Sequence, residues 1–396
     1  MEKDMQSYRL SDLVKIKNGK DHKMLSNGKY PVLGSGGIMR YVDRFLYNKP
    51  SVLLPRKGTL DNIQYCDVPF WTVDTLYYTE VNTNLANPYY LYRYLSLLDL
   101  SNLDSGTGVP SMTFDNYYGL KIFLPNIEKQ TKIAQILQTL DKKITINRQI
   151  NQNLEAMAKQ LYDYWFVQFD FPDENGRPYK SSGGEMVWNE KLKREIPKGW
   201  QASNVCSIAD ILSGGTPSKQ EPMFWNNGTI PFFGPTDYSG SIFQIETAEN
   251  ITAKGLSRCA SSLFDVGTII ITARGSIGKM VIVGTPMAMN QSCYALKSRN
   301  NEFEYLFFLT AQLIECLKAK GSGSTFKSII SSDIEQSTLC IAPQSFITQF
   351  GLVVKPIFEK IKDNSFEIAT LTKQRDELLP LLMNGQVSVN SDLSHD

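Results

Sequence analysis

The chain has 396 residues, of which 42% are hydrophobic, and it carries 41 basic and 40 acidic residues. This length accommodates two or three domains, and the near balance of charge excludes a protein that coats a polyanion through net charge alone, so any nucleic-acid binding depends on individually placed side chains. No run approaches the roughly 18 apolar residues of a membrane span, and the first ten residues lack the layout of a signal peptide, which predicts a cytoplasmic protein without membrane contact.

Residues 1–125 are predicted to form a mixed domain in which strands dominate. Short apolar runs such as "SVLLP" from Ser51 and "TLYYTEV" from Thr75 are bounded by turn residues, as strands are. The stretch "NPYYLYRYLSLL" from Asn87 has the pattern of a helix packed on that sheet.

Residues 126–169 change to the period of a long helix, for which Asn126 is a suitable N-cap. Apolar residues recur at heptad a and d positions, and Ile136, Met157 and Tyr164 follow the same pattern as the main seam. About 40 helical residues reach roughly 60 Å, which is long enough for a spacer between domains. The predicted pairing residues of this helix are Ile133, Leu140, Asn147, Ile150, Leu154 and Leu161.

The second half of the chain repeats this order. Residues 170–197 are rich in Pro, Gly, Ser and charge and predict a connector, and residues 198–343 contain strand-like runs such as "GTIIITA" and a helix pattern in "NEFEYLFFLTAQLIECLKA". A second long helix is predicted over residues 344–386, followed by a tail over residues 387–396. Its predicted pairing residues are Ile357, Ile361, Asn364, Ile368, Leu371 and Leu378.

The two halves align with each other at a shift of 217 residues. This shift places Lys57-Gly58-Thr59-Leu60 on Arg274-Gly275-Ser276-Ile277 and Asn147 on Asn364. A period near 200 residues indicates a duplicated domain, since the units of a solenoid have 20 to 50 residues. A buried Asn at an a position fixes register and partner number, so we expect Asn147 and Asn364 to bring the two helices face to face. The alternative is two amphipathic helices on separate cores.

Candidate catalytic motifs are incomplete. In "TARGSIGK", Thr272 to Lys279, a phosphate-binding loop would need a glycine where Ala273 stands and Ser or Thr where Met280 stands. "NPYY" from Asn87 is similar to the motif with which amino-methyltransferases hold an extruded adenine, but no glycine-rich cofactor loop follows a strand, and Asn-Pro often opens a helix. Asp237 and Glu246 lack the lysine that a metal-dependent nuclease would add.

Metal and nucleophile sites are equally unsupported. The chain has two histidines and six cysteines without a C-x-x-C pair, so the cysteines are expected to be reduced core residues. We therefore predict a binding protein without a catalytic centre, metal or cofactor of its own.

Loops rich in Gly, Thr, Ser, Lys and Arg lie between the predicted strands of both domains. Such loops suit contact with phosphates, and their polar side chains suit contact with base edges. Alternatively, the glycines and serines only build turns and the cations are solvated. The candidate DNA-binding residues are Arg56, Lys57, Thr59 and Asn62 in the first domain and Thr216, Ser218, Lys219, Arg274, Ser276, Lys279 and Lys327 in the second.

Over nearly its whole length the chain resembles the specificity subunit of type I restriction-modification systems. The resemblance rests on the helix exit "WFVQFDF", the stretch "IPKGW" followed by "SGGTPSK", the turn "RGSIG" and a "GST" segment before a Pro-led helix, in that order. It implies an α+β fold in which two strand-rich target-recognition domains are separated by two long helices that form an antiparallel coiled coil with a pseudo-two-fold internal repeat.

The resemblance also implies function and partners. Each domain would read one half of a split, asymmetric target in double-stranded DNA, and the helices would set the distance between the halves. The subunit would itself be non-catalytic and would recruit two adenine-methylating modification subunits and then ATP-driven restriction subunits. The first domain lacks a counterpart of "GGTPSK", since its equivalent stretch is "KNGKDHKML". Two other classes remain open, a scaffold that pairs two protein-binding domains and a methyltransferase that acts alone.

Overall fold

The structure is a computed structural model that describes residues 5–58, 60–100, 110–320 and 328–387. The chain forms two compact units, one made of Met1–Lys143 with Leu371–Asp396 and the other of Ile144–Thr370. The long helices α4 (Ile127–Tyr162) and α8 (Gln344–Met383) each contribute one end to each unit. Within the described ranges, none of the helices is long and apolar enough to cross a membrane.

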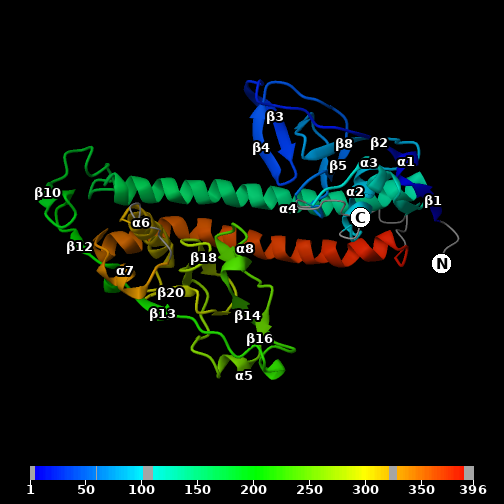
Figure 1. Ribbon diagram of the computed structural model, residues 1–396. Helices are drawn as coiled ribbons and strands as arrows, with labels where there is room; N and C mark the ends of the chain where they lie inside the picture. Colours follow the sequence, from blue (N-terminus) through cyan, green and yellow to red (C-terminus); the bar gives the residue numbers. More distant parts are fainter. Residues whose placement is uncertain (1–4, 59, 101–109, 321–327, 388–396) are drawn as a thin grey trace, which may run out of the picture. The chain divides into compact units, whose positions relative to one another are not determined.

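The first unit contains three small sheets, with strand orders β2-β8-β5-β6, β4-β3-β7 and β1-β9. Its core lies between the first of these sheets, α2 and the ends of the long helices. Figure 1 shows these elements in blue and cyan. Their bounds are β1 (Gln6–Arg9), α1 (Leu10–Leu13), β2 (Val14–Lys17), β3 (Asn27–Gly34), β4 (Gly37–Val42), β5 (Ser51–Pro55), β6 (Gln64–Cys66), β7 (Trp71–Thr72), β8 (Leu76–Val81), α2 (Pro88–Ser96), α3 (Phe114–Tyr118) and β9 (Lys121–Leu124).

The second unit contains a five-stranded sheet, β13-β20-β17-β18-β15, with the smaller sheets β16-β14-β19, β12-β21 and β10-β11. The bounds of its strands are β10 (Met186–Asn189), β11 (Arg194–Pro197), β12 (Gln201–Ser203), β13 (Ala209–Ser213), β14 (Ile230–Phe233), β15 (Phe243–Gln244), β16 (Asn250–Ile251), β17 (Ile269–Thr272), β18 (Met280–Val283), β19 (Ala288–Met289), β20 (Cys293–Ser298) and β21 (Leu339–Ile341). Its helices are the π-helical turn η2 (Asp163–Val167), the 3-10 turns η3 (Val205–Ser207), η4 (Pro222–Phe224) and η5 (Pro235–Asp237), and α5 (Ala253–Leu256), α6 (Phe303–Lys320) and α7 (Ser331–Gln336).

The sheets show the internal duplication directly. The order β2-β8-β5-β6 of the first unit corresponds to β13-β20-β17-β18 of the second, and β4-β3-β7 corresponds to β16-β14-β19. The pairing directions also match, because β3 pairs parallel with β7 as β14 does with β19, while the other neighbour of each is antiparallel. The predicted class of two mixed, strand-rich domains with two long helices is confirmed.

Local sequence explains where the helices begin and end. The side-chain oxygen of Asn87 accepts hydrogen bonds from the backbone amides of Tyr89 and Tyr90 (3.0 and 3.1 Å), so "NPYY" opens α2 as a helix cap. Asn126 caps α4 in the same way by accepting from Lys129 N (2.9 Å). At the other end of α8, Gly385 has a φ of 68°, which is the left-handed conformation typical of a helix stop.

The inner face of α4 is rotated from the predicted one. Four residues spaced by seven are buried on α4, namely Leu137, Ile144, Asn151 and Ala158. Their row lies beside one of the two predicted rows, that of Ile133, Leu140, Asn147, Leu154 and Leu161. The prediction that Ile150 belongs to the seam is wrong, because its side chain is 38% exposed, as are those of Met157 (45%) and Tyr164 (37%). The helix carries apolar residues on both flanks of the true seam, so its sequence alone does not select the buried flank. On α8, the predicted residues Ile357, Ile361, Asn364 and Leu371 are buried, and Ile368 and Leu378 are partly buried.

The prediction that the two helices face each other is confirmed, but the residue of α4 that contacts Asn364 is Asn151 and not Asn147. Asn364 Nδ2 donates to Asn151 Oδ1 (2.8 Å), and Asn151 Nδ2 donates to the carbonyl oxygen of Ile361 (3.3 Å). The repeat accounts for the difference, since a shift of 217 residues carries Asn147 onto Asn364 and Asn151 onto Ile368. The pseudo-symmetric mate of the observed pair is therefore Asn147 with Ile368. Asn147 Nδ2 is accordingly buried without a hydrogen-bond partner among the described residues.

A buried charge network joins the long helices to α2 in the first unit. Asp141 on α4 accepts hydrogen bonds from Tyr89 and Arg93 of α2 and from Arg375 Nη1 of α8, the last at 3.1 Å. Arg93 also donates to the Tyr89 hydroxyl (3.0 Å). Burial raises the pKa of the Asp141 carboxyl, but the hydroxyl of Tyr89 and the two guanidinium groups outweigh burial and hold the pKa below its usual value.

Replacement of Asp141 by Asn should destabilise the first unit by about 3 kcal/mol, because two partly buried guanidinium groups lose their counter-charge. Urea unfolding of the full chain measures the change. Glu128→Gln on the same helix removes the exposed pair with Lys132 and should cost far less than Asp141→Asn. Equal losses for the two variants would show that the network contributes no more than a surface pair.

The same network should make the first unit sensitive to acid. Since the folded pKa of Asp141 is below its unfolded value, its stabilising effect is complete above about pH 4 and is lost as the pH falls through the folded pKa. The difference in unfolding free energy between the native chain and Asp141→Asn should therefore shrink below pH 4.

Candidate nucleic-acid interface

The first candidate loop follows β5 and is held from both sides. The amide of Gly58 donates to the carbonyl oxygen of Pro110 (3.0 Å), and the amide of Met112 donates to that of Arg56 (2.9 Å). Gly58 has a φ of 88°, a conformation that favours glycine. A Cβ built on Gly58 would lie 3.4 Å from Ser35 Oγ, so this loop adjoins the turn between β3 and β4.

The four residues predicted to bind DNA from this loop have different environments. Arg56 donates to the carbonyl oxygen of Asp74 (3.4 Å) and lies 5.9 Å from the centre of the Tyr77 ring, and Asn62 Nδ2 donates to the carbonyl oxygen of Ser35 (2.6 Å). Arg56 and Asn62 thus help to fix the loop and the neighbouring turn. Lys57 is exposed to solvent. Thr59 lies outside the described residues.

Sequence reasoning missed Gln64, which supports the same turn by donating from Nε2 to the carbonyl oxygen of Gly34 (2.9 Å). The contact between Gln64 and Gly34 could not be found from their spacing in the sequence, because it forms only where two sheets pack together.

In the second domain, "TARGSIGK" is a closed turn between β17 and β18. The amides of Ile277 and Gly278 donate to carbonyl oxygens of Gly275 (3.0 Å) and Thr272 (2.9 Å), and the amide of Lys279 donates to Thr272 Oγ1 (3.0 Å). A phosphate-binding loop requires such amides to face the ligand, so this geometry agrees with the failure of the nucleotide-binding motif. What the turn presents to solvent is the exposed side chains of Arg274, Ser276 and Lys279.

The loop "SGGTPSK" packs tightly on the domain. A Cβ at Gly214 would lie 2.1 Å from the carbonyl oxygen of Asn290, and one at Gly215 would lie 2.6 Å from the amide nitrogen of Ala260, so both glycines allow close backbone approach. The hydroxyl of Thr216 forms a hydrogen bond with the side-chain oxygen of Gln291.

The other predicted DNA-binding residues of this domain are Lys219, Ser218 and Lys327, and the two that the structure describes have different environments. Lys219 Nζ forms an ion pair with Glu249 (2.5 and 2.6 Å) and lies 3.5 Å above the Trp225 ring, so its charge is already satisfied. Ser218 is exposed, and its carbonyl oxygen accepts a hydrogen bond from Trp225 Nε1 (2.9 Å). Lys327 lies outside the described residues. Glu249 was not found from the sequence, because it lies 30 residues from Lys219 in another loop.

Over the described ranges, His, Cys, Asp and Glu side chains form no group of three that could hold a metal ion. The amide oxygen of Asn87 is occupied by its cap, and Tyr90 beside it is fully buried, so "NPYY" does not present its polar groups to a substrate.

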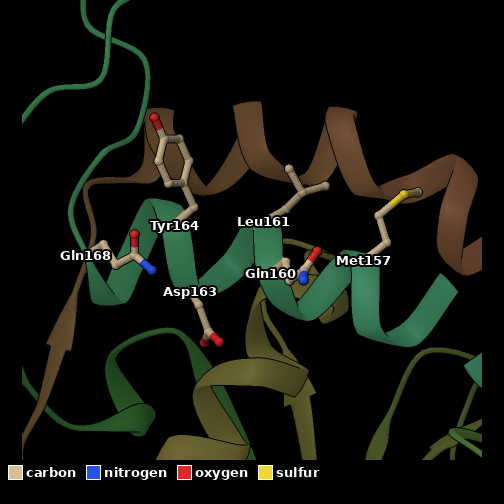
Figure 2. A pocket seen from close by; sticks show the side chains of 6 residues that line it. All are labelled: Met157, Gln160, Leu161, Asp163, Tyr164 and Gln168. Atoms are coloured by element: carbon tan, nitrogen blue, oxygen red, sulfur yellow. The ribbon is translucent and has the colours of Figure 1, made fainter. Parts of the chain in front are cut away.

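A second surface lies on the outer flank of α4 in the second unit. Met157, Leu161 and Tyr164 follow one another along one side of the helix, while Asp163 points elsewhere (Figure 2). With Gln160 and Gln168 they line an open depression of about 400 Å³. Because all six residues lie on or just after α4, it is a feature of the helix surface and no enclosed cavity. Ile146 and Ile150 extend this exposed apolar flank toward the helix start, with 54% and 38% of their surface exposed.

Comparisons with known proteins agree with this architecture. The family described as "Type I restriction modification DNA specificity domain" matches residues 2–156 and 197–349, one match in each half. The specificity subunit of the type I restriction enzyme MjaIX from Methanocaldococcus jannaschii is 30% identical over 311 residues, covering 76% of this chain and 68% of the relative. That of the type I enzyme HindI from Haemophilus influenzae is 27% identical over 368 residues, covering 78% and 79%.

Among solved structures, the S subunit of a type I restriction-modification system from M. genitalium has a similar fold, with a TM-score of 0.62 at 17% sequence identity and 96% of each chain covered. The two family matches together span well over half of the sequence. The chain therefore belongs to the type I restriction-modification DNA specificity family, as a specificity subunit that is itself non-catalytic.

Proposed function

We propose that residues 1–125 and 198–343 are two target-recognition domains, each of which reads one half of a bipartite, asymmetric sequence in double-stranded DNA. The observation that supports this most directly is a duplicated sheet framework whose exposed loops differ between the copies. Equal loops would favour equal half-sites, whereas these loops share little beyond the glycine turn of Gly58 and Gly275.

In this proposal, the contacts come from exposed side chains on rigid loops. The residues that approach phosphates or base edges are the exposed Lys57, Ser218, Arg274, Ser276 and Lys279. The residues that hold the loops in place are Arg56, Asn62, Thr216 and Lys219. Two modest interfaces on one chain raise each other's effective concentration, which explains how a chain of net charge +1 could bind specifically. A scaffold for two protein-binding domains would show no preference among duplex sequences.

We further propose that the helices set the distance between the half-sites and dock two modification subunits, which supply the adenine methylation, and then restriction subunits. The apolar flank of α4, formed by the exposed Ile146, Ile150, Met157 and Tyr164 with the partly buried Leu161, suits the apolar face of a partner helix. The shift of 217 residues replaces these five by Asp363, Glu367, Gln374, Leu378 and Leu381 on α8. The two modification subunits would then meet chemically different surfaces.

Arg274→Ala should weaken binding of the complete methylating complex to its target about 10-fold and reduce the salt dependence by about one phosphate contact. The loss should concern only the half-site read by the second domain. Lys297→Ala is the control, because Lys297 Nζ is paired with Asp265 (2.7 Å) in the same domain. Competition between duplexes with either half-site scrambled measures both effects, and equal sensitivity of the two half-sites to Arg274→Ala would contradict the assignment.

Seven residues added to each long helix, after Lys143 and after Thr370, should lengthen the unread gap of the target by about three base pairs, since they extend the spacer by roughly 10 Å. A full heptad in both helices preserves both seams. Insertion between Glu155 and Gln160 would instead disturb Ala158, which is fully buried in the second unit.

Mapping of methylated adenines in cells that carry the chain and its modification subunit gives the gap directly. Seven residues inserted at Gly176, an open turn with a φ of 74°, should leave the gap unchanged. A constant gap with altered half-site bases in the helix variant would refute the spacer role.

Met157→Asp should weaken binding of the modification subunit to the chain by at least 10-fold, because it places a charge in an apolar contact, while the chain alone stays as stable as before. Gln152→Asp adds the same charge to an exposed position of α4 on the side away from this flank and should have little effect. Titration calorimetry with the isolated modification subunit measures both, and equal affinities for the two variants would place the docking surface elsewhere.

A further inference from the structure

The β3-β4 ribbon of the first domain has an unusually apolar outer edge. Strand β4 is the outermost strand of the sheet β4-β3-β7, and its side chains Ile38, Met39 and Tyr41 are 56%, 58% and 51% exposed. Proteins usually protect edge strands with charge, proline or a covering element, because an apolar edge invites association. Such a surface therefore indicates a binding site.

The ribbon holds these side chains in a defined position. In the register of β3 and β4, Val32 pairs with Arg40 and Leu33 pairs with Ile38, so Met39 is an extra residue in a β-bulge. Bulges redirect a side chain and often lie at functional sites. On the inner face, Val32 and Val42 are fully buried, so the outer face stands on a packed core.

The tip of the ribbon is both open and anchored. No heavy atom lies within 4 Å of a Cβ built on Gly36 or Gly37, so the tip can approach a large ligand closely. Behind it, the side-chain amides of Asn62 and Gln64 donate to the carbonyl oxygens of Ser35 and Gly34. The ribbon tip and the loop that carries Lys57 therefore form one surface.

The charge of this part of the chain identifies the occupant. Residues 15–57 contain ten basic and two acidic residues, whereas the rest of the first 125 residues contains four basic and ten acidic ones. Lys29 and Arg44 lie beside the ribbon and are exposed, the Arg44 side chain by 76%. An apolar surface surrounded by basic side chains suits a polyanion that exposes apolar groups between its phosphates. DNA does so in its major groove, where the methyl groups of thymine are exposed.

Among the residues that the structure describes, the second domain has no equal of this ribbon. The corresponding strands β14 and β16 have four and two residues and are separated by a segment that contains β15, whereas β3 and β4 have eight and six residues and are joined by a tight turn. The two domains thus differ strongly at the β3-β4 ribbon, where a difference in the bases recognised by the two domains could arise.

We propose, resting on the function proposed above, that the β3-β4 ribbon enters the major groove of the first half-site and that Ile38 and Met39 contact the methyl groups of thymine. A two-stranded ribbon fits the major groove, and the thymine methyl group is the apolar feature by which that groove distinguishes a T·A pair. Lys29, Arg44 and Lys57 then contact the flanking phosphates.

The test starts from the methylated-adenine map of cells that carry the chain and its modification subunit. Met39→Ala and Ile38→Ala should relax the methylated sequence at T·A positions of one half-site only, with the other half-site and the gap unchanged. Val68→Ala is the control, since Val68 is 50% exposed in the same domain but lies away from the ribbon in sequence and on no strand. Unchanged maps for both ribbon variants would overturn the proposal.

A second measurement needs no variant of the protein. Uracil replaces each thymine of the mapped half-site in turn, which deletes one methyl group, and binding of the purified native complex is measured. One or two positions should lose about 3- to 10-fold in affinity, and Met39→Ala should be insensitive to the same replacement. No loss at any thymine would refute the methyl contact.

Two further outcomes would show that the ribbon has another role or that the proposed function is wrong. If the ribbon instead pairs with a second copy of the chain, Met39→Ala will change the molecular mass in solution from dimer to monomer and leave the methylated sequence intact. If the native complex methylates no defined sequence at all, the proposed function itself fails, which is distinct from a native complex that is specific but indifferent to the ribbon.

Discussion

The fold depends on the antiparallel pairing of α4 and α8, because the core of each compact unit contains residues from both helices. In the first unit, Ile133 and Leu137 near the start of α4 share a core with Leu379 and Leu382 near the end of α8. In the second unit, Ala158 and Tyr162 near the end of α4 share a core with Phe350 and Phe358 from the first half of α8. Each domain thus stabilises both helices, and each helix must be in register for both domains to form. A buried polar pair such as Asn151 with Asn364 disfavours other registers, since a slip would leave two amides without partners.

The two units place different side chains where the long helices pack against each domain. The shift of 217 residues relates Asp141 to Phe358 and Ala158 to Arg375, so the ion pair of the first unit corresponds to an aromatic ring and a small residue in the second. Around Phe358 the second unit gathers Phe303, Phe307 and Phe308, with ring centres 5.9 to 6.3 Å away. The two positions therefore belong to a core in both units, but only the first unit places charges there. Because Phe358 and Ala158 cannot ionise, the acid sensitivity expected of Asp141 has no counterpart at these two positions of the second unit.

The sequence was sufficient for the features that depend on composition and repetition. The strand-rich domains, both long helices and the duplication follow from apolar periodicity and the 217-residue shift, and the helix caps at Asn87 and Asn126 follow from residue type. The seam of α4 was misplaced by one position because Ile150 is apolar and Asn151 polar, while their burial is decided by the partner helix and domain. The loops were more difficult for the same reason. Lys219 looks available in sequence, but Glu249, 30 residues away, neutralises it. The apolar ribbon edge was missed because Ile38, Met39 and Tyr41 resemble ordinary core residues until the sheet order shows that β4 has no outer neighbour.

The glycine turn illustrates where specificity must reside. In "TARGSIGK" the amides of residues 277 to 279 donate to Gly275 and Thr272, so this turn satisfies its own hydrogen bonds and leaves none of these three amides for a ligand. Under the proposed function, recognition of the DNA is then left to side chains such as Arg274 and Lys279, which can change while the turn persists. The first domain keeps the turn at Gly58 but places beside it a long ribbon with an apolar edge, and the second places beside it the loop of Thr216. A framework that satisfies its own hydrogen bonds permits such exchange at little cost in stability. Under the proposed function, this separation between a fixed scaffold and variable side chains would let two copies of one domain in a single chain serve two different half-sites.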